Sequence, residues 1–161
     1  MILIAMGVSG CGKTTIGELL AERLGCDFAD ADSFHSQANK DKMHKGIPLT
    51  DEDRWPWLDR LNAELKAHAA RGETLYLACS ALKQRYRDRL AAGQPGTRFV
   101  YLKCPIELIR ERLSHRHGHF MPASLLDSQF AELEEPQDAI VLDGAQTPEE
   151  MVREFQRKTA D

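Results

Sequence analysis

The sequence predicts an α/β domain in which a parallel five-stranded sheet is covered by helices on both faces. Three observations support this class. Short apolar runs alternate with amphipathic helical patterns along the 161 residues, the runs are almost continuously apolar, and a glycine-rich loop joins the first run to the first helical pattern. Because the strands of such a sheet end at one edge, we expect ligands to gather there.

The first element is the apolar run 2–6, which leads directly into Gly-Val-Ser-Gly-Cys-Gly-Lys-Thr at 7–14. This loop fills every fixed position of the pattern G-x-x-x-x-G-K-[ST], and the apolar spacing at 16–24 predicts a helix after it. Glycines let the backbone wrap its N–H groups around a polyphosphate, Lys13 adds charge for the β and γ oxygens, and Thr14 offers a hydroxyl to Mg²⁺. A chance glycine-rich turn is the alternative. We expect the nucleotide to be bound by Gly7, Ser9, Gly10, Cys11, Gly12, Lys13 and Thr14.

The second strand is a shorter run through Phe28, and it ends in Asp30-Ala31-Asp32. Residues two apart on an extended segment face the same side, so both carboxylates are predicted to emerge beside the phosphate loop. Phosphoryl transfer needs a metal-holding acid and a hydroxyl-orienting acid, which suggests Asp30 for Mg²⁺ and Asp32 for the acceptor. The alternative is a pair of solvated acids that cap a helix near Ser33.

The remaining elements continue the alternation of strand and helix. The other predicted strands are 74–79, 98–102 and 139–143. Apolar side chains at helical spacing predict helices over 57–65, 82–90, 106–113 and 151–155.

Two polar segments do not fit the alternation of strand and helix. Segment 36–52 contains a glycine and a proline, and segment 114–122 is rich in histidine and glycine. Neither is predicted to form a packed element. We expect an acceptor-binding insertion at about 35–57 and a lid at about 114–122, with plain solvated connections as the alternative.

Four basic residues are candidates for contacts with an anionic ligand. Arg54 could grip a carboxylate or phosphate bidentately, and Lys83 follows the third strand closely enough to reach its end. Arg112 and Arg116 lead into the predicted lid, where an arginine could close over the nucleotide and stabilise transition-state charge. For any one of them, a place on a solvated helix face is the alternative.

Composition limits the class of protein. The net charge of -4 and a pI near 5.9 give no basic footprint for a general nucleic-acid binder. No apolar run approaches the ~20 residues of a membrane span, and no positive region precedes the first run as in a signal peptide. The four cysteines are dispersed without a C-x-x-C pair, so reduced thiols are expected. These features predict a cytoplasmic protein that binds neither nucleic acid nor membrane.

With these motifs in place, the sequence resembles the bacterial gluconate kinases (gluconokinases), in the branch of small P-loop kinases that also contains the shikimate kinases. The likeness runs nearly end to end. It rests on segments 6–14, 30–32 with His35, 42–54 with 57–58, 79–83 with 86–87, 116–120 and 129–136. The first segment is common to many NTPases, whereas Cys-Ser-Ala-Leu-Lys at 79–83 and Gly-Ile-Pro-Leu-Thr-Asp-Glu-Asp-Arg at 46–54 are far more specific. The chain departs from the family pattern at Ala31, Phe34 and Ser36.

The resemblance implies a single three-layer P-loop kinase domain over 1–161, with a lid, that uses ATP and Mg²⁺ to phosphorylate the 6-hydroxyl of D-gluconate. It implies that Lys13 and the loop amides hold the phosphates, that Thr14 and Asp30 organise Mg²⁺, and that Asp32 orients or deprotonates the acceptor hydroxyl.

The same resemblance implies that Arg54 binds the sugar acid with His35 and Lys83 as neighbours, that Arg116 acts from the lid, and that the protein is a homodimer. Two other functions stay open. One is a kinase for another small hydroxy acid such as shikimate, although shikimate kinases carry a glycine-rich turn where this chain has 79–83. The other is a nucleotide-binding regulatory module.

Overall fold

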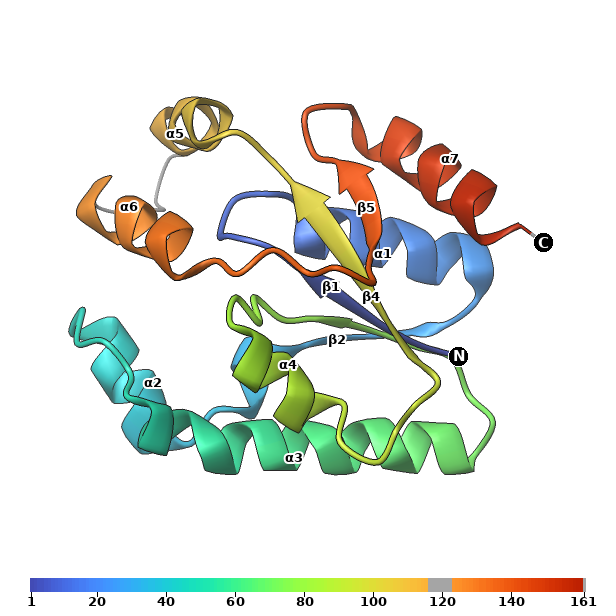
Figure 1. The fold of residues 1–161 in the computed structure, drawn as a ribbon, viewed down its shortest axis with the longest axis horizontal. Coiled ribbons are helices and arrows are strands. Elements are labelled where there is room, and N and C mark those ends of the chain that lie inside the picture. Colours follow the sequence, from blue (N-terminus) through green and yellow to red (C-terminus); the bar gives the residue numbers. More distant parts are fainter. Residues whose placement is uncertain (116–122, 161) are drawn as a thin grey trace.

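A parallel sheet with the strand order β2-β3-β1-β4-β5 forms the centre of the structure (Figure 1). This computed structural model describes residues 1–115 and 123–160. Within these residues the strands are β1 (Ile2–Met6), β2 (Asp27–Asp30), β3 (Leu75–Ala78), β4 (Thr97–Lys103) and β5 (Ile140–Asp143). The helices are α1 (Lys13–Leu24), the 3-10 helix η1 (Ala31–Phe34), α2 (Gln37–His44), α3 (Asp51–Ala70), α4 (Gln84–Leu90), α5 (Ile106–Ser114), α6 (Ala123–Glu132) and α7 (Pro148–Thr159). The predicted α/β class with its five-stranded parallel sheet is confirmed.

All strand pairs are parallel, so the segments that follow β1, β2 and β3 meet at one edge of the sheet. The central strand β1 is buried along its whole length, which explains its continuous apolar sequence. Beyond the strand ends, the Gly7 N–H donates to the Ser80 carbonyl at 3.2 Å. This bond joins the loop after β1 to the turn after β3.

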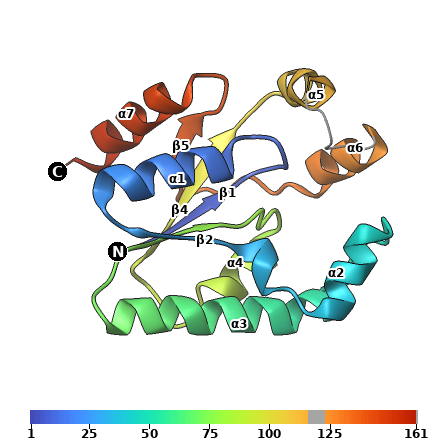
Figure 2. The same cartoon turned by 180° about the vertical axis from the view of Figure 1, so that it is seen from behind.

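Helices cover both faces of the sheet, as Figures 1 and 2 show from opposite sides. Helices α1 and α7 pack on one face, and their apolar residues join Leu3, Tyr76 and Leu142 in one core cluster. Helices α3 and α4 pack on the other face around Ile4, Leu77 and residues of their own. At the carboxyl edge α2 lies below the sheet in Figure 1, and α5 and α6 lie above it.

The segment 36–52 contains packed helical structure, so its prediction as irregular chain was wrong. Helix α2 begins after Ser36, whose hydroxyl accepts the Asn39 N–H, and α3 begins after Thr50 with a reciprocal capping box to Asp53. These caps satisfy N–H groups at the helix starts and allow two helices in a polar stretch. Within this segment only Ser36 and residues 45–50 lie outside a helix.

Helix α6 was also not predicted. Leu126 is buried in the core cluster that also contains Leu3, Tyr76 and Leu142, and Phe130 and Leu133 pack against this cluster. The spacing of these three residues is helical, but it begins directly after the glycine-rich segment that was assigned to the lid. Most of that predicted lid, residues 116–122, lies outside the described residues.

Among the described residues, none of the helices has the length and apolar character that crossing a bilayer requires.

Candidate active site

The phosphate loop owes its shape to glycines with backbone angles that other residues rarely adopt. Gly7 has φ 145°, and a Cβ there would come within 2.8 Å of the Cys11 sulfur and 2.9 Å of the Leu102 carbonyl oxygen. Gly12, with φ 99°, is the N-cap of α1. Side chains at these positions would strain or block the loop, so the curvature predicted from the motif depends on glycine.

The N-terminus of α1 is suited to hold an anion. Gly12 provides no side-chain cap, and the first turn contains no acidic residue. The free N–H groups and the helix dipole therefore direct positive potential into the loop. Thr14 is exposed in this first turn, where its hydroxyl is accessible.

Lys13 is bound to the carbonyls of its own loop. Its ammonium group donates to the Gly7 oxygen at 2.8 Å and the Val8 oxygen at 3.0 Å. These bonds hold the charge over the loop. Because both partners are neutral carbonyls, a phosphate oxygen is a stronger partner and can draw the ammonium away from them.

The acid pair follows β2, but the extended geometry assumed for it was wrong at Asp32. Asp30 ends the strand, whereas Asp32 lies in the 3-10 helix η1, and the Asp30 carboxylate accepts the Asp32 N–H at 2.9 Å. The capping alternative is thus correct for Asp30. One carboxylate oxygen of Asp30 makes this bond, which leaves the other for a ligand.

The surroundings of the Asp32 carboxyl group shift its pKa upward. Although Asp32 keeps contact with solvent, burial by the surrounding protein raises its pKa, and the Asp30 charge raises it further, while Lys13 acts in the opposite direction. Asp32 also affects Cys79. The pKa of the Cys79 thiol is raised to about 12, mainly by burial and secondly by the negative charge of Asp32. Asp32 therefore lies close to Lys13 and to the end of β3.

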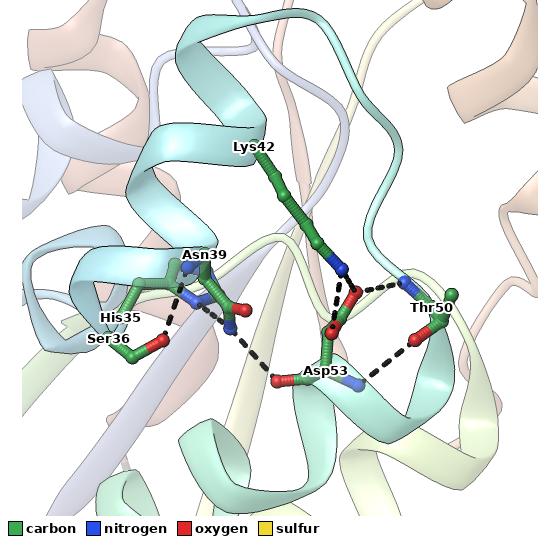
Figure 3. A network of polar contacts seen from close by, with 6 residues as sticks. All are labelled: His35, Ser36, Asn39, Lys42, Thr50 and Asp53. Atoms are coloured by element: carbon green, nitrogen blue, oxygen red, sulfur yellow. Dashed lines mark hydrogen bonds and ion pairs between the residues drawn. The ribbon is translucent and has the colours of Figure 1, made fainter.

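His35 stands at the start of α2 in a polar network that Figure 3 shows at close range. Its Nδ1 is 3.2 Å from the Asn39 side-chain nitrogen, which also donates to the Asp53 carbonyl at 2.9 Å. Lys42 pairs with the Asp53 carboxylate at 2.9 Å. The network therefore fastens α2 onto the first turn of α3.

The His35 ring is buried and neutral. It stacks on Trp57 with 4.1 Å between ring centroids, and Trp57 donates through Nε1 to the Ala31 carbonyl at 2.7 Å. Burial, then the charges of Arg54 and Lys40, lower the pKa of His35 to about 4. Trp57 thus links the histidine, the start of α3 and the acid pair.

Arg54 belongs to a cationic cluster around the Tyr86 ring. The charged groups of Arg54, Lys83 and Arg85 lie 5.1, 5.8 and 5.3 Å from the ring centroid. Arg54 donates to the Tyr86 hydroxyl at 2.9 Å, and this hydroxyl donates to Asp51 at 2.6 Å. Three cations with one nearby carboxylate make a suitable place for an anionic substrate.

The turn between β3 and α4 has an unusual backbone. Ala81 has φ 42°, a positive value for a residue other than glycine. The buried Arg87 secures this turn, because it donates to the carbonyls of Ala81 at 2.7 Å and Leu82 at 3.0 Å and to the Glu134 carbonyl at 2.6 Å. These bonds hold Lys83, the N-cap of α4, at the carboxyl edge.

Arg112 is bound to the backbone. Its guanidinium donates to the Gly144 carbonyl at 2.6 Å and to the Gly10 carbonyl at 3.4 Å. It therefore braces the phosphate loop against the turn after β5.

Gln129 of α6 contacts the phosphate loop, a contact that was not predicted although Gln129 begins the segment 129–136 on which the family resemblance rests. The Ser9 N–H donates to Gln129 Oε1 at 2.8 Å, and Gln129 Nε2 donates to the Ser9 hydroxyl at 3.0 Å. The two bonds tie α6 to the phosphate loop. Helix α6 follows the segment predicted as the lid, so Gln129 connects that region to the loop.

The structure thus brings most of the predicted site residues to one edge of the sheet, in two groups. Around the phosphate loop are Gly7, Ser9, Gly10, Cys11, Gly12, Lys13, Thr14, Asp30, Asp32 and Arg112. Around the starts of α2, α3 and α4 are His35, Arg54 and Lys83. Arg116 lies outside the described residues.

Comparisons with known proteins identify the family. A family model described as shikimate kinase matches residues 9–160. The thermosensitive gluconokinase of Escherichia coli K12 is 50% identical over 134 residues, which are 83% of this chain and 72% of that protein. The gluconokinase of Gluconobacter oxydans is 45% identical and covers 96% of this chain and 90% of its own length.

The chain belongs to the gluconokinase family. A crystal structure of a gluconokinase from Sinorhizobium meliloti agrees with this assignment, with a TM-score of 0.85 and 45% identity over 94% of this chain and 87% of that one. Membership in the gluconokinase family makes the chain a phosphotransferase with a P-loop for ATP, and the match to the shikimate kinase model reflects the wider group of small P-loop kinases.

Proposed function

We propose that this protein transfers the γ-phosphoryl group of ATP to the 6-hydroxyl of D-gluconate and so forms 6-phospho-D-gluconate and ADP. The relatives at 45–50% identity are named gluconokinases. The observation that supports the proposal for this chain is the position of Asp32. It lies in η1, which packs against α3, the helix that bears Arg54, and it is close enough to Lys13 of the phosphate loop to be influenced by that charge. A shikimate kinase activity is not favoured, because the relatives at 45–50% identity are named gluconokinases and not shikimate kinases.

The phosphate loop forms the nucleotide half of the site. Its amides and the N-terminus of α1 receive the β- and γ-phosphates, and Lys13 moves from the carbonyls of Gly7 and Val8 to the phosphate oxygens. Thr14 and the free oxygen of Asp30 are hard oxygen donors suited to Mg²⁺. When bound there, Mg²⁺ neutralises charge on the β- and γ-phosphates.

The cationic cluster around Tyr86 forms the acceptor half. Gluconate carries its carboxylate at the end opposite the reacting hydroxyl, so a pocket must hold an anion at one end and an alcohol at the other. Arg54 and Lys83 serve the carboxylate, and His35, which is neutral near pH 7, can hydrogen-bond a sugar hydroxyl without adding charge. Arg116 is proposed to reach the transferring group from the lid.

Asp32 is proposed as the residue that receives the proton. The 6-oxygen attacks the γ-phosphorus, the bond to the β–γ bridging oxygen breaks, and the hydroxyl proton passes to the Asp32 carboxylate. The raised pKa of Asp32 makes it a better proton acceptor than an ordinary aspartate. ADP then leaves with the electrons of the broken bond.

Arg54→Ala tests the acceptor half. We expect the KM for gluconate to rise at least tenfold, because a charge-assisted contact is lost, while the KM for ATP changes little. The matched control is Arg153→Ala, an exposed arginine of α7, and steady-state kinetics measure both. A larger rise in the KM for ATP than for gluconate would move Arg54 out of the acid pocket.

The homodimer that the family resemblance implies and the cytoplasmic location that the composition predicts stay predictions.

A further inference from the structure

Three side chains meet at the edge of the sheet opposite the phosphate loop. Asp27 is the first residue of β2, His68 lies in the last turn of α3, and Glu73 lies in the turn that leads to β3. Their potential ligand atoms all lie within 4.8 Å of one another. In Figure 1 this end of α3 is near the labelled N-terminus and far from α2, so the cluster is separate from the active site.

Both ring nitrogens of His68 lie next to oxygen atoms that can only accept a hydrogen bond. The side chain is only 9% exposed. Nδ1 lies 3.1 Å from the Glu64 carbonyl oxygen, which can only accept, so Nδ1 carries a proton. Nε2 lies 3.2 Å from a carboxylate oxygen of Asp27, which also can only accept. If Nδ1 carries the only ring proton, the Nε2 lone pair faces a carboxylate oxygen, and a cation can sit between the two atoms.

That cation is either a second proton on the ring or a metal ion, and we propose a metal ion. Asp27, His68 and Glu73 form a three-ligand site for Zn²⁺ with a water molecule as the fourth ligand. Imidazole nitrogen together with carboxylate oxygens is a donor set that Zn²⁺ accepts readily, whereas Mg²⁺ prefers oxygen ligands alone. The bond from Nδ1 to a backbone carbonyl is the arrangement that orients metal-binding histidines in proteins.

Arg71 is the competitor for this site. Its guanidinium is paired with Glu73, and both side chains are exposed, at 53% and 39%. Exposed ion pairs contribute little stability, so Glu73 can exchange this partner for a metal at low cost. Removing Arg71 should therefore strengthen metal binding, an effect that an isolated histidine–aspartate ion pair would not show.

The site would join three segments that are distant in sequence. A metal bound to Asp27, His68 and Glu73 links the start of β2 to the end of α3 and to the turn before β3. Because the unfolded chain does not hold these ligands together, binding stabilises the native state. The expected result is a higher melting temperature with no direct effect on the catalytic residues at the opposite edge.

Calorimetric titration of the untagged, nucleotide-free protein with zinc chloride tests the proposal. We expect one binding event of micromolar affinity and a melting temperature that rises by several degrees at about 100 times the Kd. His68→Gln and Asp27→Asn should each weaken the affinity at least tenfold, and Arg71→Gln should strengthen it several-fold. The matched control is His44→Gln, an exposed histidine of α2, which should bind zinc as the unaltered protein does.

Two results would overturn the site. One is the absence of any binding below about 100 µM zinc, which would leave His68 and Asp27 as a contact pair without a metal. The other is binding that survives both His68→Gln and Asp27→Asn, which would assign the metal to different residues. Asp27 is exposed, so its variant remains informative even if His68→Gln does not fold.

Discussion

At the scale of single residues, Asp30 and Asp32 show how environment separates two identical side chains. Asp30 accepts the Asp32 N–H and caps η1, while Asp32 lies near Lys13 with a raised pKa. The sequence predicted that both acids follow β2 and reach the phosphate loop. Their different tasks depend on the 3-10 turn, which a pattern of alternating extended residues does not reveal.

Asp32→Asn should abolish turnover and leave ATP binding nearly intact. The amide keeps the shape of the side chain but cannot accept the proton, so we expect kcat to fall by about 10²–10⁴. Turnover is measured by ADP release and affinity by calorimetry, with the exposed Asp41→Asn of α2 as control. A large loss of ATP affinity would instead place Asp32 among the nucleotide ligands.

The same variant should unfold at a higher temperature at neutral pH. A carboxyl whose pKa is raised by folding destabilises the native state once it is ionised, and asparagine removes that cost. The gain should disappear as the pH falls below the pKa of Asp32 in both states. Equal melting temperatures at neutral pH would contradict the raised pKa.

His35 should make stability depend on pH. Its pKa is about 4 in the native state and about 6.5 in the unfolded chain, so the unfolded state takes up a proton first as the pH falls. This contribution is fully present above pH ~6.5 and is lost toward pH ~4, by at most about 3 kcal/mol. Urea unfolding at several pH values measures it.

The control for this prediction is His35→Gln, which should be less stable at pH 7 but should show a flatter pH dependence between pH ~4 and ~6.5. Asp53 does not interfere. Its pKa is about 2, lowered mainly by the hydrogen bond from Lys42, so it titrates below this pH range. An unchanged slope in the variant would show that His35 is not the titrating group.

At the scale of elements, strong local signals predicted structure well and weak ones did not. The phosphate loop, with its glycines and flanking apolar runs, placed β1 and α1 correctly. Helix α2 has a mostly polar sequence with Asn39 as its buried residue, so apolar periodicity could not reveal it. It exists because Ser36 caps it and because Asn39 and Lys42 bond to α3.

Gly17 is the element-scale position where one methyl group should matter most. A Cβ there would lie 2.3 Å from the Tyr76 ring and 2.5 Å from the Phe28 ring, both on the sheet below α1. Gly17→Ala should therefore push α1 away from β2 and β3, destabilise the protein by about 1–3 kcal/mol and lower its melting temperature by several degrees.

The control is Glu18→Ala, which changes the next, exposed residue of α1 and should alter stability by no more than about 0.5 kcal/mol. Thermal unfolding compares the two. A Gly17→Ala protein as stable as the Glu18→Ala protein would contradict the tight contact between α1 and the sheet.

At the scale of the whole molecule, the parallel topology turns separate motifs into one site. The segments after β1, β2 and β3 are far apart in sequence, and the strand order brings them to one edge. This gathering was predictable from the alternation of strand and helix. The link from α6 to the phosphate loop through Gln129 and Ser9 was not predictable in this way. It joins residues 120 positions apart, and the segment 129–136, although part of the family resemblance, indicated no contact with the loop.

The most direct test of the account is the rate of ADP release from Mg·ATP in the presence of gluconate, shikimate or no acceptor. The proposed roles of Asp32 as proton acceptor and of the cationic cluster around Tyr86 as acceptor pocket predict rapid release with gluconate and rates near background with shikimate or water. Equal rates with and without gluconate would contradict it, as would a preference for shikimate.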